Sequence, residues 1–419
     1  MYNLTNVPYI LDRLVFIVMW QAPFWGIENL GLVSLEGGWV QQPHFDQPHQ
    51  ILVHEVIHQW VGNLFTISHW DEICLQEGLT SYLEWRISEN LESVSETLTD
   101  HVIETLRTYI DTGEQAIITH FNITQNIAER CFKKPPLMFH MITEAFGDSV
   151  LQIFLSNMSS KYAYKSASLT DWAETLAEAA GNHYAGKMLE DWFLKPGYPV
   201  LYVARHLDKI EIKQKIYRNK KVDSDYADSN DSFVLPVDIK YQNNNVIERH
   251  LMTGPSLNIQ HQTKASEWIL LDAEGTSYTR QLYEMFNYRS IIRDCFPTSA
   301  ASQLNCSIST VGLQSLFHDF CFGLLQDQLP ITAKNDSTVM EDADWVMNRL
   351  RLLTDSSYTG QSRLSVSKTC RCCFKNEAEL LAEKISAWNP GCKFMWNKYC
   401  GGLRIMRILG RNFTIDTHN

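Results

Sequence analysis

Long hydrophobic runs are missing from this sequence of 419 residues. The longest apolar stretch near its start, residues 14–20, is far shorter than the roughly 20 residues that a membrane-spanning helix needs. This stretch follows Asp12 and Arg13 rather than a basic segment, and no small-residue cleavage site comes after it, so it does not resemble a signal peptide. We therefore expect no signal sequence and no membrane segment in this chain, and we predict that residues 14–20 form a buried strand.

Positive charge is also scarce. The 36 Lys and Arg residues are outnumbered by 48 Asp and Glu residues, which gives a formal net charge of −12. A protein that binds nucleic acid through the phosphates needs a basic surface, so we expect no nucleic-acid partner. Hydrophobic residues make up 45% and charged residues 20% of the chain, which is the composition of a folded globular protein.

Cysteine is sparse in the first two thirds of the chain, where only Cys74 and Cys131 occur, and crowded in the last third. Crowding of this kind predicts disulfides; a metal-thiolate cluster at residues 370–373 is the less favoured alternative. Seven Asn-x-Ser/Thr sequons are present where chance gives about three: Asn3, Asn122, Asn157, Asn230, Asn305, Asn335 and Asn412. Together these features favour a glycoprotein of the secretory pathway, while reduced thiols and unused sequons remain the alternative.

The residue patterns divide the chain into three parts, as its length suggests at roughly 150 residues per domain. Residues 1–50 have the composition of strands and loops, and helical spacing follows to about residue 192. Residues 210–283 contain apolar residues with period two between turn signals, which predicts a small β-sandwich, and helical patterns then return. We predict a mainly α fold with β, with domains at 1–204, 205–288 and 289–419, the last a truncated helical domain.

The most informative stretch is His54-Glu-Val-Ile-His58. Histidines four residues apart on a helix project from one face, so both imidazoles can bind one Zn²⁺. Glu55 lies beside such a metal rather than on it, where it can take a proton from the water that the metal activates. The alternative is two histidines on an ordinary amphipathic helix.

A catalytic zinc site needs a third protein ligand, and Glu77 is the candidate because it opens a second helical pattern after His58. Glu84 follows seven residues later on the same helical face, where its carboxylate could orient a ligand histidine. For Glu84 the alternative is a solvated charge on the helix surface. His69 and Trp70 lie between the two helical segments and either line the cleft or pack in the core.

Residues 54–84 resemble the zinc site of the gluzincin aminopeptidases, the family of aminopeptidase N and leukotriene hydrolase. The resemblance implies a thermolysin-like zinc metallopeptidase domain at residues 1–204, whose start is incomplete because the family's N-terminal β-domain is absent from this chain. Residues 25–32 also resemble the Gly-Ala-Met-Glu-Asn motif of the family, which binds the substrate's free α-ammonium. The resemblance therefore implies substrate binding by Glu28 and Asn29, with Trp25 and Gly26 replacing the first two motif residues.

The sequence departs from the family where a tyrosine hydroxyl should donate to the oxyanion of the reaction intermediate. The matching stretch begins with Phe132, and no tyrosine occurs between Tyr109 and Tyr162. Loss of one oxyanion donor typically lowers the rate about 10²–10³-fold. Phe132 therefore marks a degenerate oxyanion position.

The resemblance implies a metalloaminopeptidase with one zinc ion that hydrolyses peptides with a free N-terminus. The alternative is a catalytically impaired relative that acts as a peptide-binding or regulatory module. A homodimer, or a pair with a related peptidase, is left open by the sequence. The resemblance also implies an extracellular or membrane-associated ectoenzyme lineage.

Overall fold

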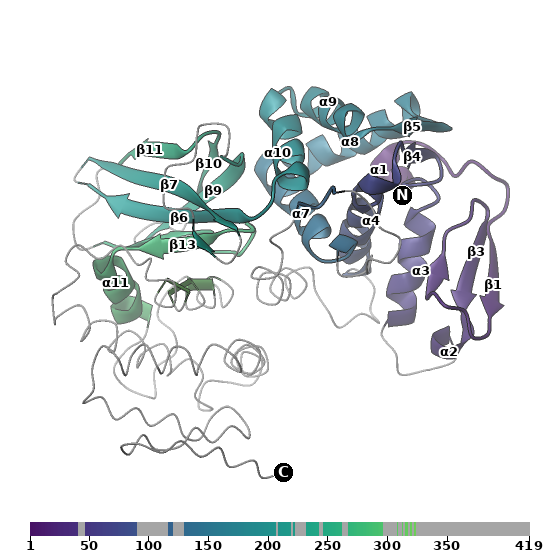
Figure 1. Ribbon diagram of the computed structural model, residues 1–419, viewed down its shortest axis with the longest axis horizontal. Helices are drawn as coiled ribbons and strands as arrows, with labels where there is room; N and C mark the ends of the chain where they lie inside the picture. The colour runs from purple at the N-terminus through teal and green to yellow at the C-terminus, as the bar shows by residue number, and fades with distance from the viewer. Residues whose placement is uncertain are drawn as a thin grey trace, which may run out of the picture.

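The computed structural model describes residues 1–40, 47–89, 116–119, 130–206, 208–218, 221–222, 232–242, 246–261 and 267–295, with isolated positions between 308 and 323. In this part of the chain a helical region and a small sheet lie on one side of the molecule, and larger sheets lie on the other (Figure 1). The fold is mixed α and β with several small sheets. This agrees with the predicted combination of helices and strands.

The N-terminal segment forms a three-stranded sheet in the order β1-β3-β2. Its elements are α1 (Tyr2–Thr5), β1 (Val15–Met19), β2 (Gly26–Ile27), β3 (Leu32–Glu36) and α2 (Gly37–Val40). The strand predicted at residues 14–20 is present as β1, but the prediction that it is buried is wrong, because all five of its residues are exposed. The physical reason is that no element among the described residues covers the faces of β1 enough to bury it, and β1 is also an edge strand paired only with β3 in this part of the chain.

Two helices after this sheet carry the residues singled out by the sequence patterns. These are α3 (Gln47–Ile57) and α4 (Ile73–Ser88), separated by β4 (Phe65–Ile67) and the 3-10 turn η1 (Trp70–Glu72). Most residues of α4 are buried on every side of the helix, because α3 and α7 pack against it. An inner helix of this kind holds its side chains in fixed positions.

A group of helices completes the helical region: α7 (Lys134–Phe146), α8 (Asp148–Lys161), α9 (Leu169–Ala180) and α10 (His183–Leu194), with β5 (Lys165–Ala167) paired to β4. The start of α9 is a capping box in which Ser168 and Asp171 bond each other's backbone N–H groups. Gly181 ends the helix in the left-handed conformation. The helical spacing read from the sequence holds here, since Trp172 and Leu176 are buried.

The strands after α10 form two further sheets. The first has the order β11-β7-β6-β13 with β8 attached to β7, and the second has the order β10-β9-β12. The strands are β6 (Tyr198–Arg205), β7 (Lys209–Arg218), β8 (Lys221–Val222), β9 (Leu235–Tyr241), β10 (Glu248–Met252), β11 (Ser256–Gln260), β12 (Ile269–Leu271) and β13 (Arg280–Tyr283). The period-two pattern at Ile210, Ile212 and Ile216 is buried in β7, as alternation predicts. β6 pairs with β7 along its whole length. This sheet therefore begins at Tyr198, a few residues before residue 205, where the sequence patterns predict the start of the second domain.

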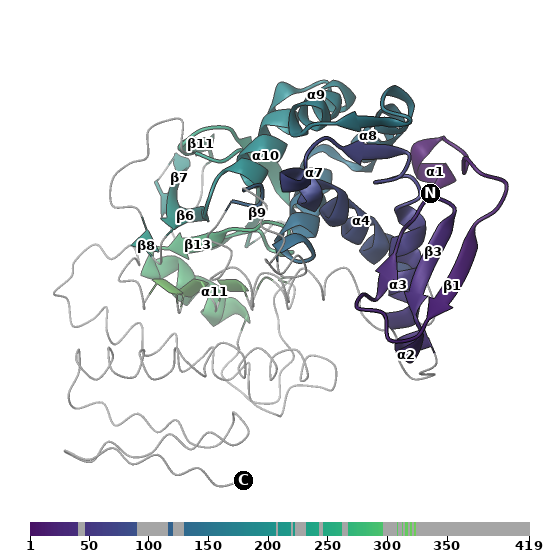
Figure 2. The same ribbon diagram turned by 45° about the vertical axis from the view of Figure 1, so that its right-hand side comes forward.

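After the sheets, α11 (Met285–Cys295) is the last element with described bounds. The helical patterns expected after the sheets are described beyond α11 only at isolated positions up to residue 323, and the cysteines from Cys306 onward lie outside the described residues. Among the described helices, none is long and apolar enough to cross a membrane. Figure 2 shows the helical region and the sheets from a second direction.

Candidate metal centre

The two histidines of the His-Glu-x-x-His pattern lie one helical turn apart. His54 is on α3, and His58 directly follows the last residue of that helix. The backbone N–H of His58 still donates to the carbonyl of His54, at 3.2 Å, so the helical turn continues to His58. Both imidazoles therefore project from the same face.

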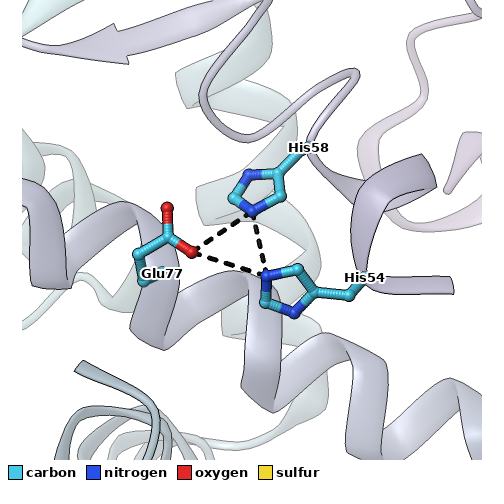
Figure 3. A group of neighbouring side chains, drawn as sticks. All are labelled: His54, His58 and Glu77. Atoms are coloured by element: carbon cyan, nitrogen blue, oxygen red, sulfur yellow. Dashed lines mark hydrogen bonds and ion pairs between the residues drawn. The ribbon is translucent and has the colours of Figure 1, made fainter. Parts of the chain in front are cut away.

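Glu77, on the neighbouring helix α4, completes a group of three possible metal ligands (Figure 3). Its Oε2 lies 3.4 Å from Nε2 of His54 and 3.4 Å from Nε2 of His58, and the two Nε2 atoms are 3.0 Å apart. One ligand atom from each residue lies within 4.8 Å of the others. Two imidazoles and one carboxylate are the donor set of many catalytic zinc sites, so these residues fit a zinc ion.

Each imidazole is also oriented by a hydrogen-bond partner at its other nitrogen, Nδ1. Nδ1 of His54 lies 3.2 Å from Oε2 of Glu84, and Nδ1 of His58 lies 2.9 Å from the carbonyl oxygen of Val61. Because a carboxylate and a carbonyl oxygen accept, Nδ1–H donates in each of these contacts, and Nε2 of each ring faces Glu77, where it offers its lone pair to a metal once the ring is neutral. The contact with Glu84 is the one proposed from helical spacing, whereas the contact with a backbone carbonyl had no sequence signal.

Glu77 is fixed by the packing of α4 against the segment that starts α7. A disulfide joins Cys74, one turn before Glu77, to Cys131, and both cysteines are fully buried. Gly78 permits close contact with α7, because a Cβ at this position would lie 2.5 Å from Cβ of Pro135. The sequence does not predict that Cys74 pairs with Cys131, since a separation of 57 residues carries no pairing signal.

Glu55 is buried against the strand that precedes the site. A Cβ on Gly26 would lie 2.3 Å from Oε1 of Glu55, so only glycine leaves room for the carboxylate in this position. The other oxygen, Oε2, is buried and has no hydrogen-bond partner among the residues that the structure describes. Burial raises the pKa of Glu55 to about 7, which the charges of Glu28 and Glu77 support and those of His54 and His58 oppose.

The pKa values of His54 and Glu77 depend on each other. Burial alone would lower the pKa of His54, but hydrogen bonds to Glu77 and Glu84 raise it to about 10. Burial would raise the pKa of Glu77, but the charges and hydrogen bonds of His58 and His54 hold it well below its usual range. The site therefore favours an ionised carboxylate beside a positive charge.

Glu28 is held at the cavity by three amide side chains that the sequence analysis did not single out. Gln59 and Asn63 donate to its backbone carbonyl, and Nε2 of Gln76 donates to its Oε1 at 3.4 Å. Asn29 follows Glu28 and also lines the cavity. The only sign of this role in the sequence is that Gln59 and Asn63 come directly after His58. Residues so close to a ligand histidine lie near the segment that carries Glu28.

Phe132 lies at the metal centre as a ring without a donor. Its phenyl group packs edge-on against His54, with ring centroids 5.7 Å apart and an interplanar angle of 88°. Nothing in the phenyl group can donate a hydrogen bond to an oxyanion. Its neighbour Cys131 is the disulfide partner of Cys74, so Phe132 is tied to the helix that carries Glu77.

All of these groups surround one cavity of about 1050 Å³. Its lining includes Glu28, Asn29, His54, Glu55, Glu77, Glu84 and Phe132, together with Trp70 but not His69. His58 is almost fully buried behind them. The structure thus brings together every residue that the sequence analysis had assigned to the site.

Residues 1–192 match the model of the peptidase family M1 domain. The chain carries a peptidase family M1 domain. The M1 family is zinc-dependent. The match ends inside α10, before the first strand of the larger sheets.

Curated relatives of this M1 domain include proteins named as peptidases or enzymes and one named as a non-peptidase homolog. Aminopeptidase N of Rattus norvegicus is 23% identical over 68% of this chain and 32% of its own length. The thyrotropin-releasing hormone-degrading ectoenzyme of the same species is 25% identical over 68% of this chain and 30% of its own. Matrix non-peptidase homolog 1 of Caenorhabditis elegans is 23% identical over 78% of this chain and 39% of its own. The chain thus spans between 30% and 39% of the length of these relatives.

Proposed function

We propose that this chain is a zinc-dependent aminopeptidase that hydrolyses the N-terminal peptide bond of peptides. The observation that carries the proposal is the convergence of His54, His58 and Glu77 on one point beside the buried carboxylate of Glu55. Zinc, when bound, lowers the pKa of a water molecule and polarises the scissile carbonyl. His54, His58 and Glu77 are the residues that would hold it.

Glu55 has the environment of a general base. Its pKa of about 7 lies close to neutral pH, where a carboxylate can both accept and return a proton. Its unpartnered Oε2 can receive the proton of the attacking water, and the same atom can then deliver it to the leaving amine. Gly26 keeps this carboxylate beside the strand that leads to Glu28.

Glu28 supports the restriction to the N-terminal bond. A carboxylate held at the cavity by Gln76, and through its backbone by Gln59 and Asn63, is a suitable partner for the α-ammonium of a peptide. Asn29 would help to hold the same end of the substrate. A peptide fixed by its ammonium group presents its first peptide bond to the centre.

The presence of Phe132 indicates that the proposed hydrolysis is slow. The ring stands against His54 in the place where the resembling family provides a hydroxyl donor, and a phenyl group supplies none. A missing donor of this kind costs about 10²–10³ in rate. The remaining groups can still carry out the hydrolysis.

A second candidate function is peptide capture without efficient cleavage. The same Phe132 ring favours it, and so does the similarity to a relative named as a non-peptidase homolog. In this case His54, His58 and Glu77 would hold a structural zinc, and the cavity would bind peptides for a regulatory purpose. A homodimer or a pair with an active relative would fit such a module.

The buried Cys74–Cys131 disulfide supports an oxidising compartment for either function. Together with the seven sequons it supports an extracellular ectoenzyme lineage. We propose a thermolysin-like catalytic domain at residues 1–204, a β-sandwich domain at 205–288 whose first sheet also takes in β6 from Tyr198 onward, and a helical domain at 289–419.

The first test is turnover of aminoacyl fluorogenic substrates by the zinc-loaded chain and by Glu55→Gln. We expect the variant to lose about 10²–10⁴ in kcat, because the general base is removed. Glu174→Gln, a matched change at an exposed position of α9, should leave kcat unchanged. Equal turnover by the parent and Glu55→Gln would overturn the assignment.

The two functions are separated by Phe132→Tyr. If the chain is an aminopeptidase with a defective oxyanion site, the added hydroxyl should raise kcat about a hundredfold with little change in KM. A variant that binds peptides and zinc but still cleaves nothing would favour the capture function.

A further inference from the structure

Gln76 is a buried amide between two carboxylates of the site. Its exposed fraction is 6%, and it directly precedes Glu77 on α4. Nε2 of Gln76 donates to Oε1 of Glu77 at 3.3 Å and to Oε1 of Glu28 at 3.4 Å. Because an ionised carboxylate only accepts, the end of the amide that faces both groups is the nitrogen, whose two N–H groups can serve one carboxylate each. One –NH₂ group thus joins two carboxylates with different proposed tasks.

The bond to Glu77 determines which carboxylate oxygen faces the ligand histidines. Oε1 accepts from Gln76, whereas Oε2 lies 3.4 Å from Nε2 of each histidine. The histidines are oriented in a comparable way by Glu84 and by the carbonyl of Val61. With Gln76, each of the three candidate ligands therefore has a partner behind it. Partners of this kind typically contribute about 10–100-fold to metal affinity.

The bond to Glu28 holds a side chain whose backbone is already fixed. Gln59 and Asn63 donate to the backbone carbonyl of Glu28, so the direction of the carboxylate depends on Gln76. Glu28 and Glu77 line the cavity, whereas Gln76 is not part of its lining. Gln76 can therefore influence a bound peptide only through the two carboxylates that it holds.

The fold leaves a specific space for the amide of Gln76. Gly62, on the turn after the second ligand histidine, has a φ of +109°, which L side chains rarely adopt. A Cβ at Gly62 would also lie 2.7 Å from Cδ of Gln76, so glycine makes room for the amide. Two residues before Gln76, the disulfide between Cys74 and Cys131 fixes the same helix. The amide is therefore confined to one position.

We propose that Gln76 is a positioning residue that holds the carboxylate of Glu28 at a fixed separation from the ligand Glu77. The inference rests on the proposed function in one respect, the binding of the substrate's α-ammonium by Glu28. A single carbon atom joins the ammonium nitrogen to the first carbonyl group of a peptide, so the ammonium site and the metal centre must lie at a matching distance. A misplacement of about 1 Å can cost about 10²-fold in rate. One amide bonded to both carboxylates keeps this distance constant.

The first test compares the zinc affinity of the parent and of Gln76→Met by chelator competition. Methionine is similar to glutamine in length but has no N–H donor. We expect the affinity to fall about 10–100-fold, because Glu77 loses the partner that orients it. Gln281→Met is the matched control, since Gln281 is also buried, at 3%, and its amide donates to Thr279 in the sheets. The zinc affinity of this control should equal that of the parent.

The second test is calorimetric titration of the Glu55→Gln chain, at saturating zinc, with Leu-Ala-Ala and its N-acetylated form. We expect this chain to bind the free-amine peptide more tightly. Gln76→Met in the same background should reduce that preference about tenfold, the effect of weakening one hydrogen bond to a charged group. The affinity for the acetylated peptide should not change. A merely structural role of Gln76 would weaken the binding of both peptides alike.

A double-mutant cycle tests whether Gln76 acts through Glu28. Glu28→Gln should remove the preference for the free amine. Adding Gln76→Met to Glu28→Gln should then change the preference no further, because the group through which Gln76 acts is already lost. A further tenfold loss in the double variant would contradict the positioning role.

The outcomes separate this inference from the function on which it rests. A Glu55→Gln chain that binds both peptides equally would contradict ammonium recognition, and with it both the proposed function and the inference. A preference for the free amine that survives Gln76→Met, or a zinc affinity that this change leaves intact, would overturn the inference alone. If Gln76→Met does not fold, Gln76→Leu replaces it with the same expectations, since leucine is smaller and also has no donor.

Discussion

His54 contacts a partner through each of its two ring nitrogens and through the face of its ring. Its Nε2 faces Glu77, its Nδ1 contacts Glu84, and its ring supports Phe132. The two carboxylates raise the pKa of His54 to about 10 against the effect of burial. Because a histidine binds metal only as the neutral imidazole, a proton on His54 competes with zinc.

The affinity for zinc should therefore fall as the pH falls. Below the raised pKa of His54, each lowering of the pH by one unit should weaken binding about tenfold for each proton displaced. In Glu84→Gln the pKa of His54 is lower, so this dependence should shift to lower pH, and the affinity at high pH should drop about 10–100-fold. Zinc titrations between pH 6 and 9 measure both effects.

Glu174→Gln is the control, because it removes a carboxylate outside the site. Its affinity for zinc should equal that of the parent at every pH. An affinity of the parent that does not change with pH would contradict the coupling between His54 and its carboxylates.

The roles of residues that lie at a fixed spacing along the chain could be predicted from the sequence. Contacts between residues that only the tertiary fold brings together could not. His54, Glu55, His58 and Glu77 follow from the spacing of metal ligands, and Glu84 follows from the helical repeat. The carbonyl of Val61 could not be predicted, because every residue has one. Gln76 could not be connected with Glu28 either, since only the packing of α4 against the strand segment brings them together.

At the scale of elements, α4 and the start of α7 form one unit around Glu77. The Cys74–Cys131 disulfide and the close approach of Gly78 to Pro135 join them. This unit carries both the third ligand and Phe132. Its integrity therefore fixes the geometry of the metal centre.

Replacing Cys74 and Cys131 with alanine should destabilise the chain. Closing a loop of this length stabilises the folded state by about 4 kcal/mol, mainly by restricting the unfolded chain. Denaturant unfolding of the double variant and the parent measures the difference. A peptide map under non-reducing conditions that shows Cys74 as a free thiol would contradict the pairing on which this prediction rests.

The helical character of the region before residue 192 and the strand pattern from residue 210 onward could be predicted from periodicity, as the burial of Trp172 in α9 and Ile212 in β7 shows. β1 shows where periodicity fails. A run of five apolar residues indicates a strand but not what covers it, and this strand is exposed at the sheet edge. Burial of a strand depends on neighbours that local sequence does not specify.

At the scale of the whole molecule, one continuous cluster of buried apolar residues connects the helical region with the larger sheets. Lys134 lies within this junction, with an exposed fraction of 5%. Its Nζ donates to the carbonyl of Gly197 at 3.2 Å and lies 5.2 Å from the ring centroid of Tyr278. Burial lowers the pKa of Lys134 to about 7.

Lys134→Met should therefore stabilise the chain most at neutral and lower pH. Between pH 7 and the ordinary lysine pKa the unfolded chain binds the proton and the folded chain does not, so this lysine destabilises the fold less as the pH rises. The gain in the free energy of unfolding should shrink by about 1.4 kcal/mol per pH unit in this range. Urea unfolding of both chains at pH 7 and 9 provides the comparison, and a gain that grows with pH would contradict the effect of burial.

The central claim is that zinc held by His54, His58 and Glu77 serves to remove residues from the N-terminus of a peptide. The most direct measurement is a mass-spectrometric time course of one apolar peptide, free and N-acetylated, with the chain stripped of metal and then reloaded with zinc. We predict stepwise loss of N-terminal residues from the free peptide only, and only after zinc is restored. Cleavage at internal bonds, equal cleavage of the acetylated peptide, or an intact free peptide with zinc fully bound would contradict the claim.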